Sequence, residues 1–336
     1  MLASKIKARA MQLGYLGCGI IPASELREYK KYIDERIKVF PESKEFYDSL
    51  YGMAEPPENA KSVIVCTQNY TKYRVSESLS GLIGVSYMFE GRLPFAPDYR
   101  TNAEFEGYIQ TLGVNILKFH APARLSAAKA GLGKYGRNTF MYDPKHGSYI
   151  WIDTWVVDKE LEYDTVADDV FLSACSDGCQ KCIGACPTKA LASSYVINRG
   201  RCINQLACYT GNGIPDEDTR VEMGRWLYGC EVCQKACPMN KDVFTGNEEF
   251  PLLAEIEEYM QPERVLEMDE ETYVNIVSPR FWYIGAQNMW LWKCNALRSM
   301  INSGDSKYHD FIRKYQNDAD PRISEMARWG CVRLGI

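Results

Sequence analysis

The spacing of apolar residues predicts helices and one strand in the first part of the chain. In residues 23–40 (ASELREYKKYIDERIKVF), apolar and aromatic side chains recur at helical spacing with charges between them. We therefore expect helices throughout the first 60 residues. Residues 61–70 (KSVIVCTQNY) follow the loop EPPENA and are rich in β-branched residues. This short apolar run predicts a buried strand.

Helices and strands continue to alternate as far as residue 160. Residues 105–122 have the pattern of a helix followed by a strand. Residues 123–139 predict an alanine-rich helix that runs into a glycine loop. Residues 147–158 (GSYIWIDTWVVD) predict another strand, which we expect to pair with residues 61–70. Such alternation is typical of an α/β layer.

The pattern becomes helical from residue 250 onward. Residues 290–301, 307–316 and 320–335 predict short helices joined by Asp/Gly/Pro turns, which is consistent with one or two helical-hairpin repeats. We therefore expect three parts, which are an α/β domain, a cysteine-rich domain and a helical tail, at residues 1–165, 166–245 and 246–336.

The composition is that of an ordinary globular protein. The chain has 336 residues, of which 46% are apolar and 25% are charged. Its net charge of −5 gives no reason to expect a polyanion-binding surface overall. It shows no uninterrupted apolar leader and no run approaching 18 apolar residues. We expect a cytoplasmic protein without a membrane segment.

Thirteen cysteines change this picture, because seven of them stand in two short runs. A disulfide framework does not suit a chain of this size in a reducing compartment. A zinc site usually pairs two Cys-x2-Cys hooks, or one hook with histidines, and this chain has only three histidines. Two-cluster ferredoxins instead use runs that end in Cys-x3-Cys-Pro. Both runs here end in that way, CIGACP and CQKACP, which favours two 4Fe–4S clusters.

Two such clusters need eight thiolates, and the second run is one short. Cys202 is the natural eighth ligand, with Cys208 as the alternative. In ferredoxins the last cysteine of each run binds the other run's cluster. The predicted ligands of the first cluster are Cys175, Cys179, Cys182 and Cys237, and those of the second are Cys186, Cys202, Cys230 and Cys233.

The residues around these cysteines resemble the double-cluster region of epoxyqueuosine reductases, which are corrinoid and iron–sulfur reductases related to reductive dehalogenases. The likeness extends to the glycine loop with the strand after it, to the first strand, and to the end of the chain, which is similar to that family's HEAT-like repeat. The resemblance covers roughly residues 10–336, and the segments that carry it are 61–70, 128–152, 177–215, 225–241 and 318–335.

The resemblance implies an α+β or α/β fold. Its parts would be a nitroreductase-like or corrin-binding α/β domain, a ferredoxin-like double 4Fe–4S domain and a short C-terminal HEAT-like tail. It also implies cobalamin as a third cofactor. The positions that match the family's corrin pocket are Arg124, Met141, Ile152, Tyr209, Leu227 and Tyr228. For the apolar positions among these, core packing is the alternative explanation.

The chain departs from the family's pattern at the proton donor. The family carries an aspartate shortly before the arginine, whereas this chain has KFHAPARL, with no acid. His120 is the nearest replacement, because an imidazole can donate a proton near neutral pH. Tyr99 is the second candidate acid. It stands in a stretch where the family has Asp-Tyr-His, whereas this chain has Asp-Tyr-Arg. This divergence puts the epoxide substrate in doubt.

The leading hypothesis is a cobalamin-dependent iron–sulfur reductase acting on an unidentified small molecule or modified nucleoside. Its electrons would come from a donor such as a flavodoxin or ferredoxin. The alternative is a 4Fe–4S electron-transfer protein without corrinoid, although such a carrier would need only the cysteine-rich part. Docking of tRNA has thin support, because residues 287–336 hold eight Lys/Arg against five Asp/Glu.

Overall fold

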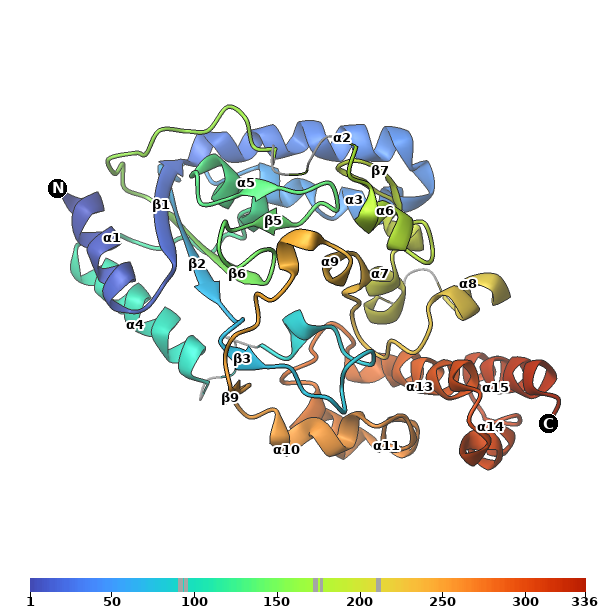
Figure 1. Ribbon diagram of the computed structural model, residues 1–336. Helices are drawn as coiled ribbons and strands as arrows, with labels where there is room; N and C mark the ends of the chain where they lie inside the picture. The colour runs from blue at the N-terminus through green and yellow to red at the C-terminus, as the bar shows by residue number, and fades with distance from the viewer. Residues whose placement is uncertain (90–92, 94–95, 172–174, 176–177, 210–212) are drawn as a thin grey trace.

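The computed structural model describes residues 1–336 except 90–92, 94–95, 172–174, 176–177 and 210–212. A small sheet flanked by helices lies at one end of the molecule, and the C-terminal helices lie at the other (Figure 1). The cysteine-rich part lies beside both, and its short helices are α6 (Lys181–Ala185), α7 (Ile203–Cys208) and α9 (Val232–Lys235).

The sheet has three antiparallel strands in the order β1-β2-β6. They are β1 (Gly17–Pro22), β2 (Ser62–Asn69) and β6 (Ile150–Val157). Strand β2 is central and nearly all of its residues are buried, as its β-branched run predicted. The two predicted strands and their pairing are therefore confirmed.

Strand β1 falls where we expected only helices, so that prediction was wrong. The sequence GCGIIP is short, and its glycines hide the strand pattern. Gly19 has a packing reason, because a Cβ atom there would lie 2.7 Å from the Cβ of Ala130. The missing side chain lets the end of helix α5 (Ala123–Lys129) approach the sheet closely.

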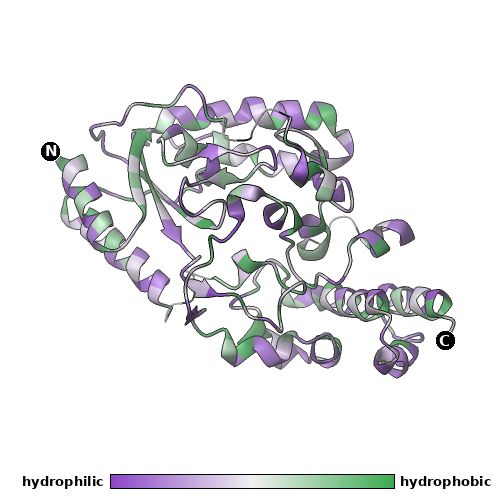
Figure 2. Ribbon diagram, viewed as in Figure 1, coloured by the Kyte–Doolittle hydropathy of each residue, from purple (hydrophilic) through white to green (hydrophobic). Residues whose placement is uncertain are grey.

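Helices cover both faces of the sheet. On one face, α1 (Leu2–Gln12) and α4 (Pro97–Thr111) pack their apolar residues against Ile20, Ile64 and Trp155. On the other face lie α5 and the 3₁₀ turn Ala23–Glu28, which leads into α2 (Tyr29–Val39). Both α1 and α4 carry hydrophilic and hydrophobic residues along their length (Figure 2), as amphipathic helices do. The helical prediction for residues 23–40 is confirmed, and the fold is a mixed α/β one.

The strand expected after α4 is wrong, because Ile116 forms only an isolated bridge with Val157. The backbone N–H of Leu117 donates to the carbonyl of Val156, and the chain then leaves the sheet. Pro122 lies just beyond, as the residue that precedes helix α5. Since proline has no N–H to donate, the pairing does not extend through it.

A second core joins residues 70–89, the cysteine-rich part and the C-terminal helices. Strand β3 (Tyr73–Arg74) pairs in parallel with β9 (Glu248–Glu249), and the ring of Tyr228 stacks on Trp292 at 5.2 Å between centroids. The expected helical tail is present as α13 (Met289–Ser303), α14 (His309–Lys314) and α15 (Pro321–Leu334). Its HEAT-like character and the three domain boundaries remain predictions.

The remaining described helices and strands are short. They are α3 (Lys44–Asp48), β4 (Lys134–Tyr135), β5 (Met141–Tyr142), β7 (Leu191–Ser193), β8 (Val196–Ile197), α8 (Glu217–Glu222), α10 (Ala254–Glu257), α11 (Pro262–Glu267) and α12 (Glu270–Thr272). Within the described ranges, no helix is long and apolar enough to cross a membrane.

Replacing Lys129 by methionine is expected to destabilise the α/β part. The Lys129 side chain is 8% exposed, and its Nζ atom lies 2.5 Å from Oε2 of Glu28 and 3.5 Å from Oε2 of Glu25. These two ion pairs join α5 to the 3₁₀ turn. We expect a loss of about 1–3 kcal/mol, because the two carboxylates keep partial access to water. Thermal unfolding measures it, with Lys30→Met as the control, since Lys30 forms an exposed pair with Asp34. Equal melting temperatures for both variants would contradict the prediction.

Candidate functional site

The predicted cluster ligands lie in loops and at the ends of short helices. Helix α6 contains Cys182 and is followed by Cys186, whereas Cys202 directly precedes α7. Helix α9 contains Cys233, and Cys237 precedes a 3₁₀ turn that begins with Pro238. No disulfide bond joins any two of the thirteen cysteines, all of which belong to the described part of the chain. Helices α6 and α9, one from each cysteine run, lie side by side.

The thiols of the second predicted set are electrostatic neighbours. The pKa of Cys233 is raised well above its usual value, first by burial and then by the charges of Cys230, Cys202 and Cys186, with Cys182 last. The pKa of Cys230 is raised to about 12, mainly by burial, and Cys202 and Cys186 contribute again. Each of the four thiols therefore takes part in the electrostatic coupling of this set, although among the described residues no three of them lie close enough together to hold a metal ion.

The first predicted set shows the same kind of coupling across the two runs. The pKa of Cys182 is raised, first by burial and then by Cys237, and Cys175 adds to the shift. Cys237 thus lies near the first run, although it belongs to the second. An influence of Cys237 on a thiol of the first run agrees with the crossed ligation expected from the sequence.

Cys208, the alternative eighth ligand, has a different setting. It lies at the end of α7 with no exposed surface, inside the core shared with the C-terminal helices. Its Sγ atom accepts a hydrogen bond from the backbone N–H of Gly229 at 3.3 Å. Burial raises the pKa of the Cys208 thiol, as it also does for Cys230 and Cys233, so the pKa does not separate the two candidates. The enclosed position of Cys208 does separate it from the half-buried Cys202.

The predicted glycine loop holds the backbone of both cysteine runs. An Nη1 atom of Arg137 donates to the carbonyl of Cys179 at 2.5 Å. The Nδ2 atom of the buried Asn138 donates to the carbonyl of Cys233 at 3.3 Å. Two successive residues of the α/β part therefore fix one run each. Sequence reasoning noted the glycines of this loop but missed these two side chains.

Arg124 reaches the same loop from helix α5. Its Nη1 atom donates to the carbonyl of Thr139 at 3.4 Å, and its guanidinium lies 4.5 Å from the centre of the Phe140 ring. The side chain is otherwise exposed. Arg124, which is predicted to bind the corrin, thus contacts the same loop of residues 137–140 that holds the two cysteine runs.

The chain is similar to proteins of known family. The model of a 4Fe-4S double cluster binding domain matches residues 175–240. The epoxyqueuosine reductase of Cellulophaga algicola is 30% identical over 252 residues, which are 70% of this chain and 78% of that protein. The chain belongs to the epoxyqueuosine reductase family. It is therefore an oxidoreductase that carries two 4Fe–4S clusters, and the iron–sulfur prediction is confirmed over zinc and disulfides.

Other epoxyqueuosine reductases show the same likeness. The Cyclobacterium marinum protein is 28% identical over 70% of this chain and 78% of its own length. A crystal structure of an epoxyqueuosine reductase with an epoxyqueuosine-modified tRNA-Tyr stem loop superposes with a TM-score of 0.73 at 21% identity, over 100% of this chain and 90% of that one. At that identity, the superposition shows a shared fold.

In this family member, the other predicted corrin residues are mostly enclosed. Met141 is buried beside α5, and Ile152 is half-buried on β6. Tyr209 is half-buried after α7, with its ring 5.2 Å from that of Tyr283. Leu227 and Tyr228 are fully buried against the C-terminal helices. Core packing accounts for the burial of these last two, and their role towards a cofactor remains a prediction.

The two candidate acids do not come together. His120 is exposed in the loop before α5, whereas Tyr99 is 38% exposed on α4, and these helices cover opposite faces of the sheet. Sequence reasoning passed over two buried carboxyl groups, Asp98 and Glu231, which are 6% and 1% exposed. Burial raises the pKa of both. In the sequence, Asp98 stands next to the candidate acid Tyr99, and Glu231 stands inside the second cysteine run. These positions were the signals that could have pointed to the two carboxyl groups.

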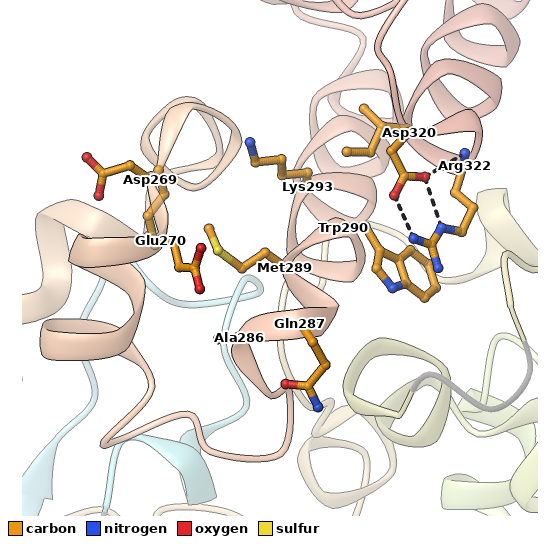
Figure 3. Close-up of a pocket in the computed structure, with 11 residues that line it drawn as sticks. Asp269, Glu270, Ala286, Gln287, Met289, Trp290, Lys293, Asp320 and Arg322 are labelled. Carbon is orange, nitrogen blue, oxygen red and sulfur yellow. Dashed lines mark hydrogen bonds and ion pairs between the residues drawn. The ribbon is translucent and has the colours of Figure 1, made fainter.

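A pocket of about 340 Å³ opens among the C-terminal helices, and no cysteine lines it (Figure 3). Arg322 in its wall lies 3.9 Å from the centre of the Trp290 ring. The same guanidinium donates to both carboxylate oxygens of Asp320, at 2.9 and 2.6 Å. None of the residues that line the pocket is one of the predicted cluster ligands.

Proposed function

We propose that this protein is a cobalamin-dependent reductase in which two 4Fe–4S clusters deliver electrons to a corrinoid. The observation that carries the proposal is the loop at residues 137–140. Arg137 and Asn138 hold the two cysteine runs, and the next two residues contact Arg124. When bound, the clusters supply single electrons and the corrinoid supplies the reductive bond cleavage.

The chain's own contribution is to attach the two cysteine runs and Arg124 to one loop, residues 137–140. The ends of the loop at residues 137–140 are held together, because the strand before it, β4, pairs with the strand after it, β5. A protein that only carried electrons would need the cysteine-rich part alone. Here the α/β part supplies hydrogen bonds to both runs, which supports a reaction centre in the α/β part.

The relatives support a modified nucleoside as the substrate class, since they are epoxyqueuosine reductases and one was solved with a modified tRNA stem loop. The Bacillus subtilis enzyme is described with an aspartate-bearing catalytic loop. In this chain, residues 117–122 contain no carboxylate. We propose His120, exposed in that stretch, as the proton donor in its place. Tyr99 is the weaker candidate, because its helix covers the other face of the sheet.

Anaerobic reconstitution tests the proposal. We expect about eight irons per chain, and about one cobalt after incubation with hydroxocobalamin and desalting. Arg124→Met should keep the iron and weaken cobalamin binding about tenfold, or ~1.4 kcal/mol. The matched control is Arg322→Met, since that arginine also stacks on an aromatic ring but lies on the C-terminal helix α15, outside the two cysteine runs. Its binding should be unchanged.

The outcomes separate the two functions. Iron without retained cobalt would contradict the proposal and favour the electron-transfer protein. If cobalamin binds, the substrate is tested with an epoxyqueuosine-containing tRNA stem loop and a reduced flavodoxin, with the product followed by mass spectrometry. Full turnover in His120→Gln would contradict its role as the proton donor.

A further inference from the structure

Two cysteines outside the cysteine runs face each other in the sheet. In the antiparallel register of β1 and β2, Cys18 is the direct partner of Cys66. Both side chains lie on the face of the sheet that α1 and α4 cover, where Cys66 has no exposed surface and Cys18 is half-buried. Neither is a predicted cluster ligand, and the proposed reaction gives neither of them a role.

The backbone hydrogen bonds at the two ends of these strands show which kind of pair the cysteines form. Antiparallel strands alternate between pairs that exchange backbone hydrogen bonds and pairs that do not, and side chains lie closer together in the second kind. The N–H of Leu16 donates to the carbonyl of Thr67 at 2.8 Å, so this carbonyl faces β1. At the other end, the N–H of Ala23 donates to the carbonyl of Lys61 at 3.0 Å. Thr67 and Ala23 therefore occupy hydrogen-bonded positions.

Alternation from either end places the cysteine pair at a non-hydrogen-bonded position. Cys66 directly precedes Thr67, and Cys18 lies an odd number of residues from Ala23. Pro22 agrees with this count, because it stands at the same kind of position as Cys18 and has no N–H to donate to β2. The Cα atoms of such a pair are typically about 4.5 Å apart, within the range of about 4.4–6.8 Å that a disulfide bond requires.

The two thiols differ in their access to solutes. Strand β1 forms the edge of the sheet beside the central strand β2 (Figure 1). The half-buried Cys18 lies on the edge strand, whereas Cys66 is enclosed on the central one. Burial raises the pKa of the Cys66 thiol, which also keeps it from reacting first. Any oxidation of the pair therefore begins at Cys18.

We infer that Cys18 and Cys66 form a reversible disulfide bond when the protein meets a low-molecular-weight disulfide such as glutathione disulfide. The Cys18 thiolate attacks one sulfur of that oxidant, which forms a mixed disulfide and releases one thiol. Cys66 then loses its proton and attacks the Cys18 sulfur, which releases the second thiol. The protein gives up two electrons and two protons, and the oxidant carries both away as two thiols. The new bond fastens the edge strand to the centre of the sheet.

Peptide mapping of anaerobically reconstituted protein tests the inference. The protein is incubated with glutathione disulfide, its free thiols are alkylated, and it is digested with trypsin in the absence of a reductant. Cleavage after lysine and arginine gives peptides 10–27 and 62–72, which contain one cysteine each. We expect these two peptides to be recovered joined by a disulfide bond, with a matching loss of both alkylated forms. Dithiothreitol should separate them again.

Two variants check the order of the steps. Cys66→Ala should stop at the glutathione adduct of Cys18, because the second thiol is missing. Cys331→Ala is the matched control, since it also removes a thiol outside the two runs but lies on α15, and it should keep the joined peptides. If Cys66→Ala does not fold, the wild-type map decides alone.

Recovery of both alkylated peptides from wild-type protein after the oxidant would overturn the inference. A stable glutathione adduct on Cys18 beside an alkylated Cys66 would overturn it as well, since the two sulfurs would then not reach each other. A disulfide bond from either cysteine to a third one would have the same meaning.

Discussion

Cys202→Ala is expected to remove about half of the bound iron, because the second cluster would lose one of its four thiolates. The structure favours Cys202 over Cys208 as that ligand. Cys202 is half-buried before α7, and it influences both Cys230 and Cys233. Cys208 is enclosed with no exposed surface in an apolar core shared with the C-terminal helices.

Iron and acid-labile sulfide, measured after anaerobic reconstitution, check this prediction. We expect about four irons in Cys202→Ala and about eight in Cys208→Ala and the wild type. The Cys208 variant is the control for removal of a thiol from the same helix region. It should lower stability by no more than about 1 kcal/mol, since alanine fills most of the same space. The opposite pattern of iron loss would show that Cys208 is the ligand.

Much of the iron–sulfur site could be predicted because its chemistry is local in sequence. A cluster needs several thiolates at fixed short spacings, and the two Cys-x3-Cys-Pro endings display that requirement directly. Strand β2 could be predicted as readily, because a buried central strand is a continuous β-branched run, and β6 could be predicted from its β-branched and aromatic residues. Strand β1 could not be predicted, since its Gly19 makes room for Ala130, a residue more than a hundred positions away.

The residues that hold the cysteine runs could not be predicted for the same reason. Arg137 and Asn138 act on carbonyl groups of Cys179 and Cys233, and a backbone acceptor leaves no trace in the sequence. The pairing of β3 with β9 also joins distant segments. A glycine-rich stretch predicts a turn, but only the fold shows that Gly136 makes room for a tyrosine ring.

Helix α13 supplies a third set of such long-range contacts. Arg298 is 1% exposed and donates to the carbonyls of Gly224 and Trp226, and to Oδ1 of Asn295. Asn295 in turn donates to the carbonyls of Ala207 and Leu227, both at 2.9 Å. Two side chains of one helix therefore fix the segment that leads into the second cysteine run.

Arg298→Met is expected to loosen that segment and lower the melting temperature by roughly 5–10 °C. The substitution leaves the carbonyl of Trp226 and Oδ1 of Asn295 without their donor, and each such buried group costs about 1–3 kcal/mol. The carbonyl of Gly224 keeps a hydrogen bond from Asn302. Burial lowers the pKa of Arg298 to about 10, so the side chain is still charged at neutral pH and its hydrogen bonds are charge-assisted. Because Cys230 follows this segment directly, the second cluster should also be lost faster on mild heating.

Calorimetry of the reconstituted protein, with iron content measured after incubation at a fixed temperature, checks both parts of this prediction. Lys293→Met is the matched control, since Lys293 lies on the same helix but lines the open pocket among the C-terminal helices. It removes one charge without uncovering a buried carbonyl, so its melting temperature should change little. If Arg298→Met melts and retains iron like this control, α13 does not position the second cysteine run. If only the Arg298 variant loses iron, the C-terminal helices form part of the structure that holds the second cluster.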